Sequence, residues 1–169
     1  MTYYKPCPSC SKPILFYKNP IPTVDVIIFS PPDNIVLIER KNYPKGWALP
    51  GGFVDHGERT EYAAIREAKE ETGLEVVLTG LLGVYSDPFR DPRLHALSIV
   101  YMAYAIDCES IRAGDDALEA SFFPWYSLPE LAFDHKRIIS DFIVFQKQLG
   151  YGKYIFSSKM PTSVPNGEG

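Results

Sequence analysis

The stretch that decides this sequence is residues 52–74, which read GFVDHGERTEYAAIREAKEETGL. On a helix, residues three and four apart share a face, so Glu67, Glu70 and Glu71 project together with Arg66 beside them. Three like charges on one face repel each other, and a solvated surface helix gains nothing from them. A hard cation such as Mg²⁺ removes this conflict, because it takes carboxylates and substrate phosphates as ligands. The residues alone therefore indicate a metal-dependent site for phosphate chemistry.

The spacing within this stretch resembles that of a known family. Gly52 is followed after five residues by Glu58, and after seven more by REAKEETGL at residues 66–74. This is the pattern of the Nudix box, and the chain resembles a Nudix hydrolase from residue 21 to about residue 150. The resemblance implies an α/β fold, a Nudix α/β/α sandwich with a mixed β-sheet between helices. It also implies hydrolysis of a nucleoside diphosphate linked to another group, with Mg²⁺ or Mn²⁺ as cofactor.

The resemblance also assigns metal ligands. The corresponding glutamates of Nudix hydrolases bind the metal, and a carbonyl of the glycine turn can add a ligand. The metal ligands expected from this resemblance are Gly51, Gly52, Glu58, Glu67, Glu70 and Glu71. Arg66 is expected to orient the glutamates by charge-assisted hydrogen bonds.

The general base is open between two sources. One is a glutamate of the box, Glu67. The other is the loop of residues 112–120, whose Asp115, Asp116 and Glu119 reach the metal if the loop folds over the site. An ordinary polar turn explains that loop equally well.

Substrate choice is predicted to depend on residues 85–95, which read YSDPFRDPRLH. Prolines stiffen this loop, and Arg90 and Arg93 offer planar guanidinium forks to phosphate. Pro88 lies fifteen residues beyond Gly73. Nudix ADP-ribose pyrophosphatases carry a proline some fifteen or sixteen residues beyond the box, so the loop is similar to theirs. A simple proline turn is the alternative.

Further candidates surround the glycine turn. Arg40 is placed to meet a phosphate, and Trp47 or Phe53 to stack on adenine, although surface pairing and core packing explain these residues as well. Asp134 precedes the last expected helix, and it is interpreted as that helix's N-terminal cap.

Composition narrows the class of protein. One domain is the expectation for 169 residues that are 46% hydrophobic. The net charge of −4 argues against a nucleic-acid surface, which is normally basic. No apolar run approaches the ~20 residues of a membrane helix, and the first residues lack the apolar core of a signal peptide. We therefore expect a cytoplasmic protein with reduced thiols and no membrane or nucleic-acid partner.

The chain divides into three parts by composition. Residues 1–20 are rich in proline and are expected to form an irregular N-terminal arm, residues 21–156 the Nudix domain, and residues 157–169 a flexible tail. Strands are expected at residues 23–29, 35–40, 47–49, 75–82, 97–107 and 121–125. Helices are expected from Thr60, as the cap, to a stop at Gly73, and over residues 135–149.

The arm contains a CxxC motif formed by Cys7 and Cys10. A structural Zn²⁺ site needs four ligands, and neither a second CxxC nor a histidine pair lies nearby. The motif is therefore interpreted as a turn without metal. The alternative is half of a zinc ribbon, which is either vestigial or completed by a second chain.

The sequence thus predicts a Mg²⁺-dependent Nudix hydrolase that converts ADP-ribose to AMP and ribose 5-phosphate, and it leaves open whether the protein forms a homodimer. One alternative keeps the chemistry and changes the substrate to an oxidised dNTP or NADH. A second alternative, of another class, is a non-catalytic sensor that binds ADP-ribose.

Overall fold

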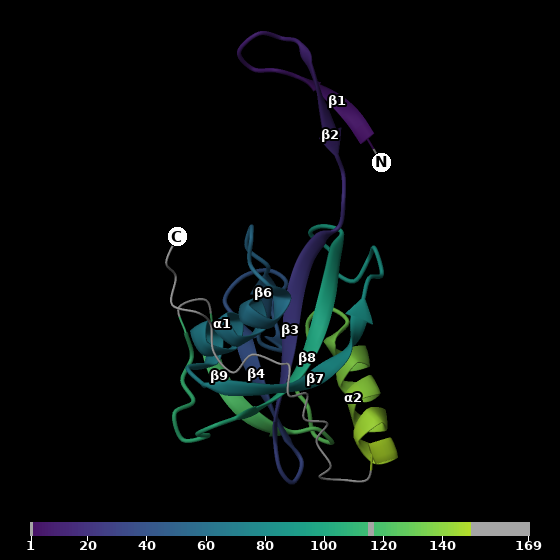
Figure 1. Cartoon of the computed structure of the whole chain (residues 1–169). Coiled ribbons are helices and arrows are strands. Elements are labelled where there is room, and N and C mark those ends of the chain that lie inside the picture. Colours follow the sequence, from purple (N-terminus) through teal and green to yellow (C-terminus); the bar gives the residue numbers. More distant parts are fainter. Residues whose placement is uncertain (1, 115–116, 150–169) are drawn as a thin grey trace.

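A mixed β-sheet lies between two helices in the computed structural model, which describes residues 2–114 and 117–149 (Figure 1). Five strands follow the order β5-β4-β3-β8-β7, while β6 pairs with β3 and β9 with β4. The β3–β8 pair is parallel and the other pairs are antiparallel. The strands are β3 (Ile21–Ser30), β4 (Asn34–Arg40), β5 (Trp47–Ala48), β6 (Gly51–Phe53), β7 (Val76–Tyr85), β8 (Ala96–Ala105) and β9 (Ala117–Pro124).

The central strand β3 is apolar on both faces because each face is covered by a helix. Val24, Val26 and Ile28 belong to the buried cluster that includes residues of α1 (Thr60–Thr72). Ile27 and Phe29 point the other way, into the cluster that includes residues of α2 (His135–Leu149). The predicted α/β/α sandwich with a mixed sheet is confirmed.

Helix α1 ends as predicted but does not begin as predicted. Gly73 adopts a left-handed conformation with φ of 72°, and its N–H bonds the carbonyl of Lys69 at 2.8 Å. The expected cap at Thr60 is wrong, because Arg59 occupies the capping position and makes no side-chain cap bond. The Thr60 hydroxyl instead lies 2.7 Å from the hydroxyl of Tyr101 on β8. The Thr60 hydroxyl therefore bonds a residue of a distant strand, whereas the sequence pattern assigns it to the first turn of α1.

The short strand β6 brings the glycine turn to α1. Val24 pairs with Gly52, and Asp25 with Gly51, so this turn lies along β3 just before the loop that leads into α1. A Cβ at Gly51 would overlap the Val24 carbonyl, which is why this position requires glycine.

The first twenty residues are not irregular, and that expectation is wrong. Strands β1 (Thr2–Pro6) and β2 (Pro13–Tyr17) form an antiparallel hairpin that stands away from the sandwich (Figure 1). The prolines fit because Pro6 and Pro13 form the last pair of the ladder, at the strand ends. The rings of Tyr3 and Phe16 stack across the two strands at 5.8 Å. The expected tail at residues 157–169 lies outside the described residues.

Candidate functional site

Arg66 is the centre of the carboxylate cluster on α1. Its guanidinium donates two hydrogen bonds to Glu58, at 2.9 and 2.8 Å, and one each to Glu67 and Glu70, at 2.7 and 3.1 Å. A fifth hydrogen bond, of 3.1 Å, reaches the carbonyl of Phe53. A guanidinium has five N–H donors, so Arg66 is fully used. Its contacts show how one cation holds three of the four box glutamates together.

Glu71 receives no hydrogen bond from Arg66. One of its oxygens accepts a 2.8 Å hydrogen bond from the Gly51 N–H. Burial raises the pKa of Glu71 to about 8, with the negative charge of Glu67 adding to the effect. Burial also raises the pKa of Glu67, although its hydrogen bond from Arg66 opposes the rise. The negative charges of Glu67 and Glu71, two of the predicted metal ligands, are therefore poorly stabilised in the absence of a further cation.

This donor set fits a hard divalent cation. Within residues 2–114 and 117–149, no three metal-binding side chains are already drawn together in a geometry that would hold an ion. The chemistry is nevertheless suitable, because Glu67 and Glu71 are poorly neutralised and Glu70, 59% exposed, has room to turn. At Gly52 a Cβ would overlap the Glu67 carboxylate, so a larger residue there would displace this side chain. The Gly51 contact that the structure shows is made by its N–H, whereas the sequence had suggested carbonyl ligands.

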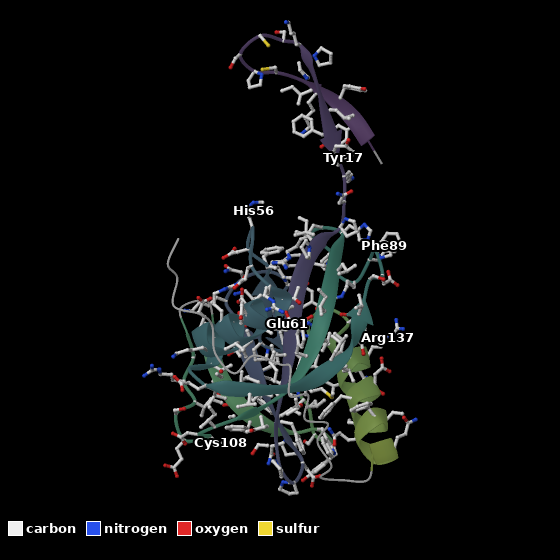
Figure 2. The ribbon with its side chains drawn as sticks, viewed as in Figure 1. Tyr17, His56, Glu61, Phe89, Cys108 and Arg137 are labelled. Carbon is white, nitrogen blue, oxygen red and sulfur yellow. The ribbon has the colours of Figure 1, made fainter. Side chains whose placement is uncertain are left out.

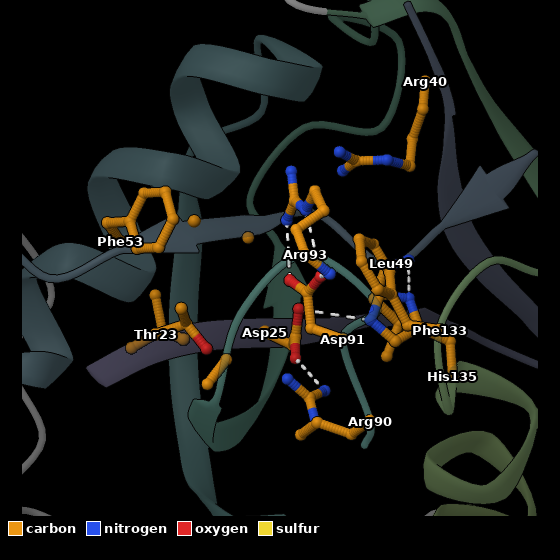
Figure 3. Close-up of a pocket in the computed structure, with 14 residues that line it drawn as sticks. Thr23, Asp25, Arg40, Leu49, Phe53, Arg90, Asp91, Arg93, Phe133 and His135 are labelled. Carbon is orange, nitrogen blue, oxygen red and sulfur yellow. Dashed lines mark hydrogen bonds and ion pairs between the residues drawn. The ribbon is translucent and has the colours of Figure 1, made fainter. Parts of the chain in front are cut away.

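A pocket opens next to the glycine turn and holds two arginines predicted to bind substrate. Arg40 and Arg93 flank the ring of Phe133, with guanidinium carbons 4.8 and 5.3 Å from its centre (Figure 3). Burial lowers the pKa of Arg40, and the positive charge of Arg93 lowers it further. Two like charges held close together favour an anionic ligand between or beside them. Gly51 and Gly52, which contact Glu71 and Glu67, line the same pocket, so the pocket adjoins the carboxylate cluster.

Arg90 also lines the pocket, but its guanidinium is directed into the protein. It donates hydrogen bonds of 3.2 and 2.8 Å to Asp134. It donates another, of 3.1 Å, to Asp25 (Figure 3). Its side chain is 5% exposed. These contacts favour a role in fixing the 86–95 loop to β3 and to the start of α2. They do not favour the phosphate contact expected from the sequence.

Asp25 is the buried acceptor of this network. It receives hydrogen bonds from Ser98 and Arg90, and its other oxygen lies 3.4 Å from Nε2 of His135. Burial alone would raise the pKa of Asp25, but His135, Arg90 and Ser98 reverse the effect and lower the pKa to about 2. His135 Nδ1 accepts a 2.9 Å hydrogen bond from the Leu49 N–H, which leaves the Nε2 proton facing Asp25.

Other predicted residues lie elsewhere. Pro88 is exposed in a turn and is not part of the pocket lining. Glu119 lies on β9 opposite Glu39, and its carboxylate accepts a 2.6 Å hydrogen bond from Ser121, so the structure gives it no contact with the box. Asp115 and Asp116 lie outside the described residues. Asp134 occupies the expected capping position before α2, since its carbonyl accepts the N–H of Ile138 at 3.2 Å, while its carboxylate binds Arg90.

The pocket also contains a residue that sequence reasoning missed. Phe133 has a positive φ of 57°, a conformation that is strained for a bulky residue and that often marks a functional position. Trp47, one candidate for stacking on adenine, instead packs edge-on against Phe123 at 4.6 Å. Phe53, the other candidate, lines the pocket and is 46% exposed. No sequence pattern signals the positive φ of Phe133, whose neighbours have distant partners: the Ala132 N–H bonds the Trp47 carbonyl, and the Asp134 carboxylate binds Arg90.

With this geometry established, the chain can be compared with known proteins. A family model of the NUDIX domain matches residues 19–143. The chain belongs to the Nudix family. It is therefore a Nudix pyrophosphohydrolase by class, as the sequence predicted. The described part of the chain has no helix that is both long and apolar enough to cross a membrane.

Three relatives show how far the likeness extends. An ADP-ribose pyrophosphatase of Methanocaldococcus jannaschii is 54% identical over 129 residues, covering 75% of each chain. A putative 8-oxo-dGTP diphosphatase of Bacillus subtilis is 36% identical over 118 residues, covering 69% of this chain and 76% of its own. The solved structure of a bifunctional NMN adenylyltransferase/ADP ribose pyrophosphatase from Francisella tularensis, complexed with AMP and a Mn ion, aligns with a TM-score of 0.65 at 26% identity. That alignment covers 79% of this chain and 43% of the Francisella chain.

The raised pKa of Glu71 leads to a prediction for the metal-free protein. The pKa of Glu71 in the folded protein, about 8, lies above the ordinary value of 4.5. The contribution of Glu71 to the stability of the fold is therefore most favourable below about pH 4.5. The free energy of unfolding should then fall as the pH rises from about 4.5 to about 8, by on the order of 5 kcal/mol from this residue. Glu71→Gln should remove that part of the decline, as measured by urea unfolding in EDTA across this pH range.

The matched control is Glu75→Gln, since Glu75 is an exposed glutamate whose carboxylate pairs with Lys69. It should keep the wild-type pH profile. If Glu71→Gln and the wild type lose stability in parallel as the pH rises, Glu71 is not the strained carboxylate.

Proposed function

We propose that this protein hydrolyses the diphosphate bond of ADP-ribose, giving AMP and ribose 5-phosphate, with Mg²⁺ as cofactor. The observation that carries the proposal is the position of the Arg40–Phe133–Arg93 pocket beside the box glutamates. Such a pocket offers cations for a diphosphate and an aromatic face for a base or sugar. The 54% identity to an ADP-ribose pyrophosphatase supports the choice of substrate.

Glu67, Glu70 and Glu71 are the residues that would hold the metal, with Glu58 supporting them through Arg66. When bound, Mg²⁺ would neutralise the charge of the diphosphate and favour attack by water. Arg66 restrains the carboxylates from moving apart, because each of its hydrogen bonds fixes one of their oxygens. The excess negative charge on this helix face would therefore be offset when the cation binds together with the substrate.

Arg40 and Arg93 would bind the diphosphate from the pocket side. Arg93 is held by two hydrogen bonds to Asp91, of 3.0 and 2.7 Å, and Arg40 by one of 2.9 Å to the carbonyl of Pro44. Each arginine retains N–H donors for a ligand. Phe133, between them, would offer a face for stacking.

The proton of the attacking water requires a base near the box. Glu67 is our candidate, since burial raises its pKa and its carboxylate lies against Gly52 at the pocket wall. In the step, the water oxygen bonds to phosphorus, the bridging P–O bond breaks, and the water proton passes to Glu67. Glu119, the other candidate, has its carboxylate bonded to Ser121 on β9 and would need a rearrangement to take part.

The proposal predicts the outcome of a substrate panel. With Mg²⁺ present, kcat/KM should be highest for ADP-ribose, by at least about tenfold over NADH, a diadenosine polyphosphate, dGTP and 8-oxo-dGTP. The products should be AMP and ribose 5-phosphate, identified by chromatography. Preference for 8-oxo-dGTP would place the protein with its Bacillus subtilis relative. Binding of ADP-ribose without turnover would make it a sensor.

Glu70→Gln tests the carboxylate cluster directly. It should lower kcat for ADP-ribose by several orders of magnitude, because it removes a charge that the metal needs. Folding should be little affected, since the Glu70 side chain is 59% exposed. Glu75→Gln, on the exposed partner of Lys69, is the control and should retain full turnover. Near-normal kcat in Glu70→Gln would remove this residue from the metal site.

Arg40→Ala tests the pocket. Loss of one charge-assisted hydrogen bond to substrate should raise KM for ADP-ribose about 10- to 100-fold, with a smaller change in kcat. Arg40 is a cleaner test than Arg93, whose removal would leave the buried carboxylate of Asp91 without its partner. Lys45→Ala, an exposed cation close in the sequence, is the control. An unchanged KM in Arg40→Ala would contradict the assignment of the pocket to the diphosphate.

A further inference from the structure

The N-terminal hairpin ends in a tightly formed turn that carries both of its cysteines. The Cys7 N–H bonds the Lys12 carbonyl at 2.8 Å, and the Ser11 N–H bonds the Cys7 carbonyl at 2.8 Å. Ser11 has a positive φ of 59°, so the chain reverses within a few residues. The two sulfur atoms of the hairpin lie at its outer end, far from the sandwich and from Cys108 (Figure 2).

The turn carries two free thiols, those of Cys7 and Cys10. The backbone N–H groups of Ser9 and Cys10, together with the Cys10 thiol, lower the pKa of Cys7. Both cysteines are free, with Cys10 exposed and Cys7 partly so. A thiolate is the form of cysteine that binds a metal, and two thiolates on one tight turn supply half of a tetrahedral Zn²⁺ site.

The rest of the chain does not complete that site. All three cysteines and all three histidines fall within the described residues, and no third metal-binding side chain there joins Cys7 and Cys10. Cys108 lies beside Ser30 at the far end of the sandwich, and His135 is bound internally to Leu49 and Asp25. The described part of the chain thus supplies two of the four ligands of a structural Zn²⁺ site, and a second molecule is a source for the other two.

Among the described strands, β1 and β2 pair only with each other. One face has the Tyr3–Phe16 stack, over which Lys5 lies 5.5 Å from each ring. The other face carries Tyr4 and Tyr17, each 69% exposed. An isolated two-stranded sheet is marginally stable at best in water, and exposed aromatic residues on it favour contact with a second surface.

We infer that two copies of this chain pair through their β1–β2 hairpins around one Zn²⁺ ion, which takes Cys7 and Cys10 from each copy. A second copy is the occupant that the chemistry selects, because it brings the two missing thiolates in the same geometry. The ion then has the four sulfur ligands typical of a structural zinc site. The sequence alone favoured a metal-free turn, and the hairpin that presents both cysteines outward is what alters that interpretation.

The test is the zinc content and mass of the full chain, purified with a thiol reductant and reconstituted with Zn²⁺. The expected result is one Zn²⁺ per two chains by elemental analysis, in a particle that native mass spectrometry weighs at twice 19.1 kDa plus one zinc ion. Cys7→Ser and Cys10→Ser should each lose the zinc, and Cys108→Ser should keep it. Protein that retains no zinc, or a monomer with one zinc per chain, would overturn the inference.

Co²⁺ titration of the reduced, metal-free protein is a second measurement that needs no variant. Sulfur-to-cobalt charge transfer and the visible bands of tetrahedral cobalt should saturate at one Co²⁺ per two chains. Saturation at one per chain, or spectra of octahedral cobalt, would contradict a site made of four shared thiolates. Neither experiment uses ADP-ribose, so failure of this inference is distinguishable from failure of the proposed function.

Discussion

The four glutamates of the Nudix box lie close to one arginine, Arg66, which cannot neutralise all of them. The arrangement of the rest of the site depends on this excess of negative charge. Arg66 donates its five N–H hydrogen bonds to Glu58, Glu67, Glu70 and a backbone carbonyl. Within residues 2–114 and 117–149, the Glu71 carboxylate accepts its hydrogen bond from the Gly51 N–H, and burial raises its pKa to about 8. A site arranged in this way is poorly satisfied alone and gains most when a cation arrives, which is the behaviour expected of a metal-dependent enzyme.

The sandwich provides the rigidity that such strain requires. Helix α1 packs Ala63, Ala64 and Ala68 against the sheet, and these small side chains contribute to the same buried cluster as β3. The glycine turn is paired to β3 on one side and bonded to Glu71 on the other. Because both anchors are fixed, the glutamates cannot relieve their repulsion by moving the helix away. The core therefore stabilises an unfavourable arrangement of charge at one edge.

Features set by local sequence were predictable, and features set by distant partners were not. The helix end at Gly73 and the α2 bounds follow from residues adjacent in the chain. Thr60 was misassigned because Tyr101, 41 residues away, takes its hydroxyl. The hairpin at residues 2–17 was missed because prolines suggested irregular structure, although the ladder places Pro6 and Pro13 at strand ends. The spacing of residues 52–74 predicted a carboxylate cluster, but no sequence pattern indicated that the Arg90 side chain points into the protein.

Arg90 and Arg93 belong to the same loop but differ in role. Arg90 fixes the loop to the rest of the fold, whereas Arg93 is proposed to bind the substrate. Arg90 is buried among Asp25 and Asp134, where a pair of carboxylates offsets much of the cost of removing its charge from water. This ties the loop to β3 and to the first residue before α2, and it places Arg93 beside Phe133 and across from Arg40. A buried ion network adds little net stability, but it fixes geometry. Here the geometry is that of a pocket in which Arg40 and Arg93 share the lining with Gly51 and Gly52, the turn that contacts Glu71 and Glu67.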